Sequence, residues 1–82
     1  MDPLYARSGK FDPADDIQAI ATAVREARRR HGMTQTELAG LSGTGLRFVS
    51  ELERGKSSVS LNKVVAVLSV LGLRLGIVGD DA

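Results

Sequence analysis

Cysteine is absent from this 82-residue sequence, and histidine occurs only once. Without cysteine, the chain can form neither a disulfide nor a thiolate zinc site, so two common means of stabilising a small domain are excluded. A chain this short buries a limited fraction of its surface, and oligomerisation is the remaining source of additional stability. We therefore expect one small domain that forms a homodimer.

Long uninterrupted apolar segments are also lacking. Lys63, Ser69 and Arg74 interrupt the apolar carboxyl-terminal part, so that part does not predict a membrane-spanning helix. The amino terminus, Met1-Asp2-Pro3-Leu4, lacks the basic and apolar regions of a signal peptide. We expect a cytoplasmic protein with no membrane partner.

Catalytic motifs are missing as well. The chain has a single histidine, His31, and no paired carboxylates on a recognisable scaffold. Gly43-Thr44-Gly45 lacks the Gly-Lys-Ser/Thr sequence that completes a phosphate-binding loop. The spacing of Asp12, Asp15 and Asp16 suits the start of a helix better than a cation site. We predict no enzymatic activity, no metal and no cofactor.

Net charge is low, at +1, but the charges are unevenly distributed. From Arg25 to Lys63 the chain has eight basic side chains against four acidic ones, whereas aspartates concentrate near both ends. A basic patch attracts phosphate, although a run of charge is also typical of an ordinary solvated face. Charge alone leaves both interpretations open.

Capping residues and periodicity predict the first helix. Residues 1–11 mix proline, glycine and charge without periodicity, which indicates a flexible arm. Asp12 can cap a helix that begins at Pro13, and Gly32 can end it. We expect a domain over residues 12–72, followed by a dimerisation strand and tail over residues 73–82.

A second helix is predicted to open with a capping box. Thr34 and Glu37 are three residues apart, so each side chain can bond the other residue's free amide hydrogen. Within this helix we expect Leu38 and Leu41 to face inward.

The following residues predict a tight turn and a third helix. Ala39 is small enough for close helix packing, Gly43 can take a positive backbone angle, and Val49 can pack back against the second helix. The third helix should run from Leu46 to Arg54. This pattern is typical of a helix-turn-helix, whose second helix can enter a DNA groove, although helical hairpins in small bundles share it.

The carboxyl-terminal part predicts an interface between two copies of the chain. A fourth helix over residues 61–71 is apolar around more than one stripe, which calls for burial on two sides. Residues 73–78 then alternate as in a strand, and a lone strand needs a partner. The residues predicted to contribute to dimerisation are Val67, Leu71, Leu73, Leu75 and Ile77.

The segments GMTQTELA and ELERGK, separated by a glycine turn, resemble the XRE/Cro/C1-type helix-turn-helix family from about Val24 to Leu73. The ending SELERGKSSVSLNKVVAVLSVLGLRL is similar to HipB-like antitoxins, whose short carboxyl-terminal strand forms a lid across the dimer. The resemblance implies an all-α, lambda-repressor-like fold of four helices with a short C-terminal β-strand that pairs across a homodimer.

The same resemblance implies a function. A HipB-like protein represses transcription by binding double-stranded operator DNA, autoregulates its operon and neutralises a HipA-like serine/threonine kinase toxin. Two alternatives remain open. The chain can be a stand-alone regulator without a toxin, or a protein-interaction module of the same fold.

Site residues are implied position by position. Arg28 and Glu53 match a structural ion pair. The expected base-reading residues are Leu46, Arg47, Ser50 and Glu51, and the expected phosphate contacts are Thr34, Gln35, Thr44, Arg54 and Lys56. Arg47 is suited to guanine, whose two acceptors a guanidinium can bond together.

Three of these positions keep a second interpretation. Arg54 and Lys56 are equally consistent with ordinary surface charge. Glu51 can accept a hydrogen bond from cytosine or hold Arg47 in a helical ion pair, and we favour the ion pair. Gly45 stands where this family usually has a serine or threonine cap, which puts one phosphate contact in doubt.

Overall fold

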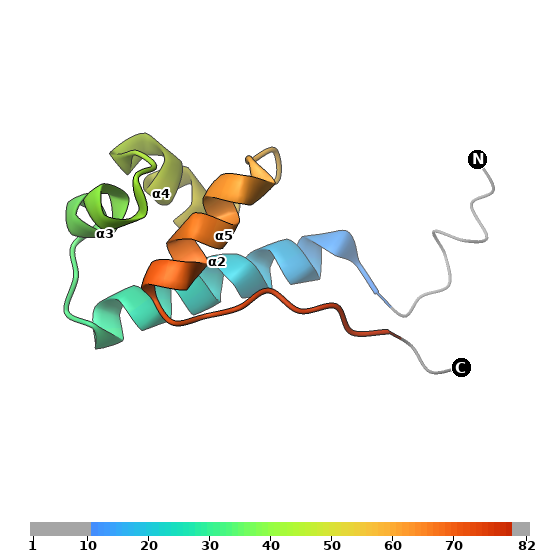
Figure 1. The fold of residues 1–82 in the computed structure, drawn as a ribbon. Helices are drawn as coiled ribbons and strands as arrows, with labels where there is room; N and C mark the ends of the chain where they lie inside the picture. Colours follow the sequence, from blue (N-terminus) through green and yellow to red (C-terminus); the bar gives the residue numbers. More distant parts are fainter. Residues whose placement is uncertain (1–10, 80–82) are drawn as a thin grey trace.

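The computed structural model describes residues 11–79, and this range contains four helices: α2 (Pro13–Arg30), α3 (Gln35–Ser42), α4 (Leu46–Glu53) and α5 (Leu61–Val70). Figure 1 shows α3 and α4 together at one end, with α5 crossing in front of the long α2. The predicted all-α fold is confirmed. The predicted arm, apart from Phe11, lies outside the described residues, as do residues 80–82 of the tail.

The helix ends form as the capping residues predict. The Asp12 carboxylate accepts a hydrogen bond from the Ala14 amide at 3.0 Å. At the start of α3, the Thr34 hydroxyl accepts from the Glu37 amide at 3.0 Å, and the Glu37 carboxylate accepts from the Thr34 amide at 2.8 Å. The predicted capping box is therefore present.

The turn between α3 and α4 depends on glycine. Gly43 has a φ of +67°, a left-handed conformation that only glycine adopts at little cost. The Thr44 amide donates to the Ala39 carbonyl oxygen at 3.2 Å, which closes the end of α3. Gly45 caps α4 in extended conformation and supplies no side-chain hydrogen bond, as its sequence predicts.

One hydrophobic core joins the four helices. Val24, Leu38, Val49 and Val67 are fully buried, one from each helix. The prediction for Leu41 is wrong, because 64% of this residue is exposed. Leu38 already occupies the core position of α3, and Leu41 lies outside the buried stripe.

Two of the predicted dimerisation residues belong to this core. Val67 is 0% and Leu71 4% exposed within the single chain, so neither side chain is free for a second copy. The prediction that they contribute to dimerisation is therefore corrected. On α5, Leu61 and Val65 are the large apolar residues that remain exposed.

The carboxyl-terminal segment extends along α2 towards the amino-terminal end of that helix (Figure 1). Leu73 packs against the core, whereas Leu75, Ile77 and Val78 are exposed. No strand occurs within residues 11–79, so the strand predicted over residues 73–78 is not formed in the single chain. A strand needs hydrogen bonds from a neighbour, and this part of the chain provides none. No helix between residues 11 and 79 is both long and apolar enough to cross a membrane.

Candidate nucleic-acid interface

The carboxylate of Glu53, at the end of α4, is buried and joins three helices. The Arg28 guanidinium of α2 donates to it twice, from Nε to Oε2 at 2.6 Å and from the second terminal nitrogen to Oε1 at 3.0 Å. Arg28 also donates to the Met33 carbonyl oxygen at 2.8 Å. The ion pair predicted for Arg28 and Glu53 is thus present, with side chains 13% and 4% exposed.

A third donor to Glu53 comes from α3. The Gln35 side-chain amide donates to Glu53 Oε1 at 3.1 Å, so it is not directed at solvent as a phosphate contact requires. The first turn of α3 still offers backbone amide hydrogens, which can bind a phosphate. Gln35 therefore orients α3 against α4 through its side chain, and a phosphate contact at this residue is left to its backbone.

Arg25 is a member of this cluster that the sequence did not indicate as a site residue. Its guanidinium donates to the Glu53 carbonyl oxygen at 2.8 Å. Arg25 precedes Arg28 by three residues, so the two side chains lie on the same face of α2. That spacing was the available signal. Arg25, Arg28 and Gln35 together fix the carboxyl-terminal end of α4.

The predicted reading residues share the outer face of α4. Val49 and Leu52 turn inward, whereas Leu46 is 49% exposed and the Arg47 side chain is 90% exposed. Ser50 and Glu51 follow one helical turn later and are partly exposed. The sequence thus brings all four predicted base-reading positions onto one face.

Glu51 pairs with two cations at this surface. Its Oε2 lies 3.3 Å from Nε of Arg47, and its Oε1 lies 3.2 Å from Nζ of Lys56. The hydrogen bond from Lys56, assisted by that from Arg47, lowers the pKa of Glu51 below its ordinary value, so the carboxylate is charged at neutral pH. Of the two interpretations of Glu51, the helical ion pair is the one observed in the free protein.

The remaining phosphate candidates differ in their freedom. Arg54 is exposed and donates only to the Ser50 hydroxyl, at 2.7 Å, whereas Lys56 is paired with Glu51. The Thr34 side chain caps α3, and the Thr44 hydroxyl bonds that of Ser42 at 2.9 Å. Among the five candidates, Arg54 therefore presents the basic side chain without a carboxylate partner.

Phe48 lies beside this face without belonging to it. Its ring packs against the core, and the Lys63 ammonium lies 5.7 Å from the ring centroid. A cation at that distance is attracted by the ring face. Phe48 therefore serves packing, and α4 presents only its outer side to a DNA groove.

Comparisons with known proteins agree with this geometry. Residues 24–78 match the family described as Helix-turn-helix. The uncharacterised HTH-type transcriptional regulator y4mF of Sinorhizobium fredii (strain NBRC 101917 / NGR234) is 43% identical over 65 residues, which cover 79% of this chain and 80% of that protein. A solved chain from a toxin–antitoxin module of Streptococcus pneumoniae is similar over 96% of this chain and 92% of its own length, with a TM-score of 0.71 and 30% identity.

The family match covers both helices of the motif together with α5, and the relatives agree with it over most of their length. The outer face of α4 is the surface that a helix-turn-helix places against DNA. The chain belongs to the XRE-type helix-turn-helix family of DNA-binding transcriptional regulators.

Proposed function

We propose that this protein is a sequence-specific repressor that binds a palindromic operator as a homodimer. The observation that carries the proposal is the outer face of α4, where Arg47 is almost fully exposed while buried Glu53 fixes the same helix. A rigid helix with an exposed guanidinium can read guanine in the major groove. Ser50 and Leu46 would contact neighbouring bases, Leu46 through a thymine methyl.

Selection from a library of randomised DNA duplexes tests this proposal. We expect the purified protein to enrich a palindrome whose half-sites are centred about 10 base pairs apart, one turn of the double helix. Failure to enrich any sequence would favour the alternative, a protein-interaction module of the same fold.

Arg54 is proposed to contact a phosphate, together with Lys56, Thr34, Thr44 and the backbone of Gln35. Because Arg54 has no carboxylate partner within the described residues, we expect Arg54→Gln to weaken binding to all duplexes alike. Each phosphate contact adds about 0.9 to the slope of log K against log salt. Binding isotherms at four salt concentrations should therefore give a slope lower by about 0.9 per protomer, and an unchanged slope would place Arg54 off the DNA.

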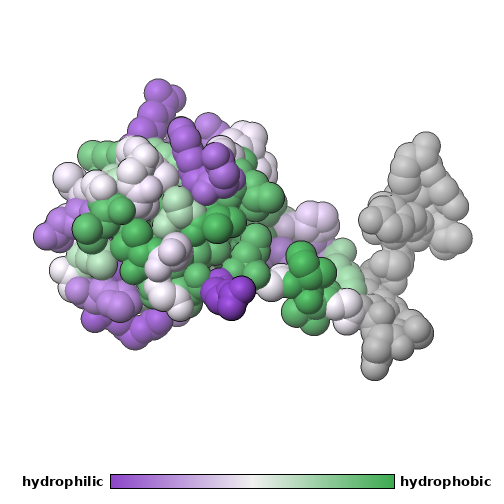
Figure 2. Space-filling view, viewed as in Figure 1, coloured by the Kyte–Doolittle hydropathy of each residue, from purple (hydrophilic) through white to green (hydrophobic). Residues whose placement is uncertain are grey.

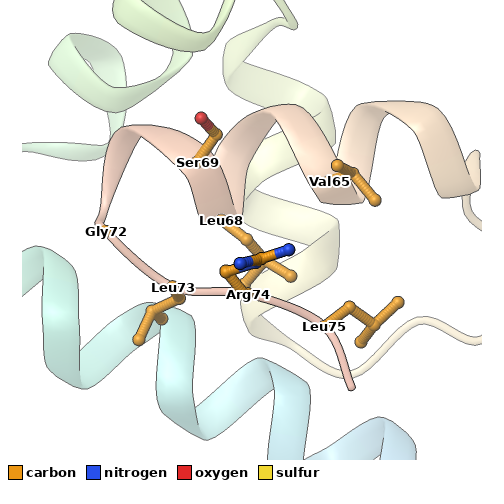
Figure 3. Close-up of a pocket in the computed structure, with 7 residues that line it drawn as sticks. All are labelled: Val65, Leu68, Ser69, Gly72, Leu73, Arg74 and Leu75. Carbon is orange, nitrogen blue, oxygen red and sulfur yellow. The ribbon is translucent and has the colours of Figure 1, made fainter. Parts of the chain in front are cut away.

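The homodimer is proposed to form on the exposed apolar surface beside α5. Figure 2 shows apolar residues across the middle of the face where α5 and the carboxyl-terminal segment lie. Figure 3 shows Val65 and Leu75 on either side of a groove of about 570 Å³, with the Arg74 side chain between them. Leu73 lines the same groove, and Ile77, which is 96% exposed, follows it.

This surface supports the dimer because contiguous apolar area of this kind is uncommon on monomers. The carboxyl-terminal segment also has free backbone groups, so two copies can pair as the predicted strand. In the dimer, Leu73, Leu75 and Ile77 are then the contributing residues, with Val65 replacing the buried Val67 and Leu71.

We expect Val65→Asp to raise the dimer dissociation constant at least tenfold, because a carboxylate would be buried against apolar residues. Val65 is exposed in the single chain, so the fold should persist. Sedimentation equilibrium measures the association, and Glu26→Asp, a conservative change at an exposed position of α2, is the control. A second variant that ends at Arg74 should weaken the dimer in the same way. A dimer unaffected by both changes would contradict the proposed interface.

We further propose that the protein is the antitoxin of a HipBA-like system and neutralises a HipA-like serine/threonine kinase toxin. Support comes from the similarity to a chain of a toxin–antitoxin module and from the HipB-like ending of the sequence. The named relative favours the second candidate, a regulator without a toxin. The neighbouring gene distinguishes them. An adjacent reading frame should encode a kinase whose autophosphorylation stops on addition of this protein, and the lack of such a gene would favour the lone regulator.

A further inference from the structure

The side chain of Arg47 is held by only one of its nitrogens. Nε donates to Glu51 at 3.3 Å, and no other hydrogen bond or ion pair of Arg47 occurs within residues 11–79. The two terminal nitrogens therefore remain available. These nitrogens are the pair that can bond O6 and N7 of guanine together. Glu51 thus restrains the guanidinium without occupying the atoms that read the base.

Lys56 is held by the same residue through two bonds. Its Nζ donates to Oε1 of Glu51 at 3.2 Å, and its backbone amide donates to the Glu51 carbonyl oxygen at 3.1 Å. Gly55, with a φ of +84°, makes the reversal that returns the chain to α4. The ammonium group is consequently fixed beside the reading face, with its charge offset by the carboxylate.

We propose that Glu51 is a positioning residue for DNA selectivity: it orients Arg47 towards guanine and withholds Lys56 from the phosphates of arbitrary DNA. This inference rests on the proposed operator binding. It assigns to one carboxylate both a gain in specific binding and a loss in non-specific binding.

The electrostatic reason concerns the difference between the two kinds of complex. Affinity for arbitrary DNA comes almost entirely from cations that replace counterions along the phosphates. A carboxylate that engages two cations and itself faces the DNA reduces that affinity. At the operator, the oriented guanidinium gains base contacts that arbitrary DNA does not offer, so the carboxylate raises the ratio of the two affinities.

Glu51→Gln tests the inference, since it removes the charge and keeps the size of the side chain. The probes are the duplex enriched by the wild-type protein and a duplex of the same length and scrambled sequence. We expect affinity for the scrambled duplex to rise about two- to fivefold per protomer, with a salt slope steeper by up to about 0.9 per protomer. The ratio of operator to scrambled affinity should fall about tenfold.

Glu26→Gln is the matched control, because it removes the same charge from an exposed position on α2. It should leave the ratio within about twofold of the wild-type value. A thermal melt of each variant separates loss of structure from loss of selectivity, since an unfolded variant would lose both affinities rather than gain one.

A cycle with Lys56→Met isolates the second half of the inference. In the Lys56→Met background, Glu51→Gln should no longer steepen the salt slope on scrambled DNA. A slope that steepens regardless of Lys56 would overturn the withholding of that cation. If Glu51→Gln instead changes only which base is preferred beside the guanine, Glu51 reads that base directly and the inference is wrong. Failure of the wild-type protein to enrich any duplex would defeat the proposed function itself, and the two failures are therefore distinct.

Discussion

Replacement of Glu53 by alanine should lower the free energy of unfolding by about 3 to 5 kcal/mol, the cost of leaving one member of a buried ion pair without its partner. The change removes both acceptors of the Arg28 guanidinium and the acceptor of the Gln35 amide. A domain of this size is stable by only about 5 to 15 kcal/mol, so the loss is a large part of the total. Urea unfolding followed by circular dichroism measures it.

Two comparisons make this result specific to the pair. Glu26→Ala, at an exposed position, should change stability by less than about 0.5 kcal/mol. The double variant Arg28→Met with Glu53→Leu should be more stable than the sum of the two single losses predicts, since neither charge is then left buried alone. Additive losses would mean that the two residues contribute independently, contrary to the geometry.

The same carboxylate makes stability depend on acid. Burial alone raises the pKa of Glu53, but hydrogen bonds from Arg28 and Gln35, with the charges of Arg28 and Arg25, outweigh it and hold the pKa below its ordinary value of 4.5. A lowered pKa in the folded state means that the unfolded chain binds the proton more readily. The stabilisation is therefore complete above the ordinary pKa and is lost as pH falls through the folded-state value.

We expect the melting temperature to fall between about pH 5 and pH 3, with a smaller fall in Glu53→Gln, which has no proton to gain at this position. Differential scanning calorimetry across this range measures both proteins. Equal slopes for the two would assign the acid sensitivity to other carboxylates.

Local sequence signals predicted the helices and their ends well. The Thr34–Glu37 capping box and the positive backbone angle of Gly43 depend on neighbouring residues alone, and both are present. The faces of α5 could not be assigned in this way. Apolar residues surround that helix, so the pattern does not tell which of them, such as Val65 or Val67, will contact the rest of the same chain.

The site shows the same division between local and distant information. The spacing of Arg47 and Glu51 is enough to predict their ion pair, because residues four apart on a helix are neighbours. Gln35 was expected at a phosphate, yet its amide bonds Glu53, 18 residues away. Only the packing of α3 against α4 determines that contact. The pairing of Arg28 with Glu53 was available from family resemblance and not from spacing.

The structural and reading roles of α4 are therefore carried by different residues of one short helix. Buried Glu53 receives hydrogen bonds from α2 and α3, while Arg47 and Glu51 lie on the outer face. Misplacement of the helix by a fraction of its diameter would move every reading residue at once. We therefore expect stability and selectivity to respond separately, the first to Glu53 and the second to Arg47.

Arg47→Ala should abolish most of the preference for the selected operator. A guanidinium that bonds both acceptors of guanine contributes about 1 to 3 kcal/mol of discrimination, and a symmetric dimer makes the contact twice. The expected loss is about 2 to 6 kcal/mol in the difference between operator and scrambled affinities. Titrations of both duplexes by fluorescence anisotropy at one salt concentration measure this difference.

The identity of the lost contact follows from two further variants. Arg47→Lys retains the charge but cannot bond two acceptors in one plane, so it should recover affinity for scrambled DNA without recovering selectivity. Arg30→Ala removes an exposed cation from α2, outside the reading face, and should lower both affinities slightly and equally. The Arg47 side chain is 90% exposed, so its loss should not alter the melting temperature. Full selectivity in Arg47→Ala would show that the outer face of α4 reads its operator through other residues.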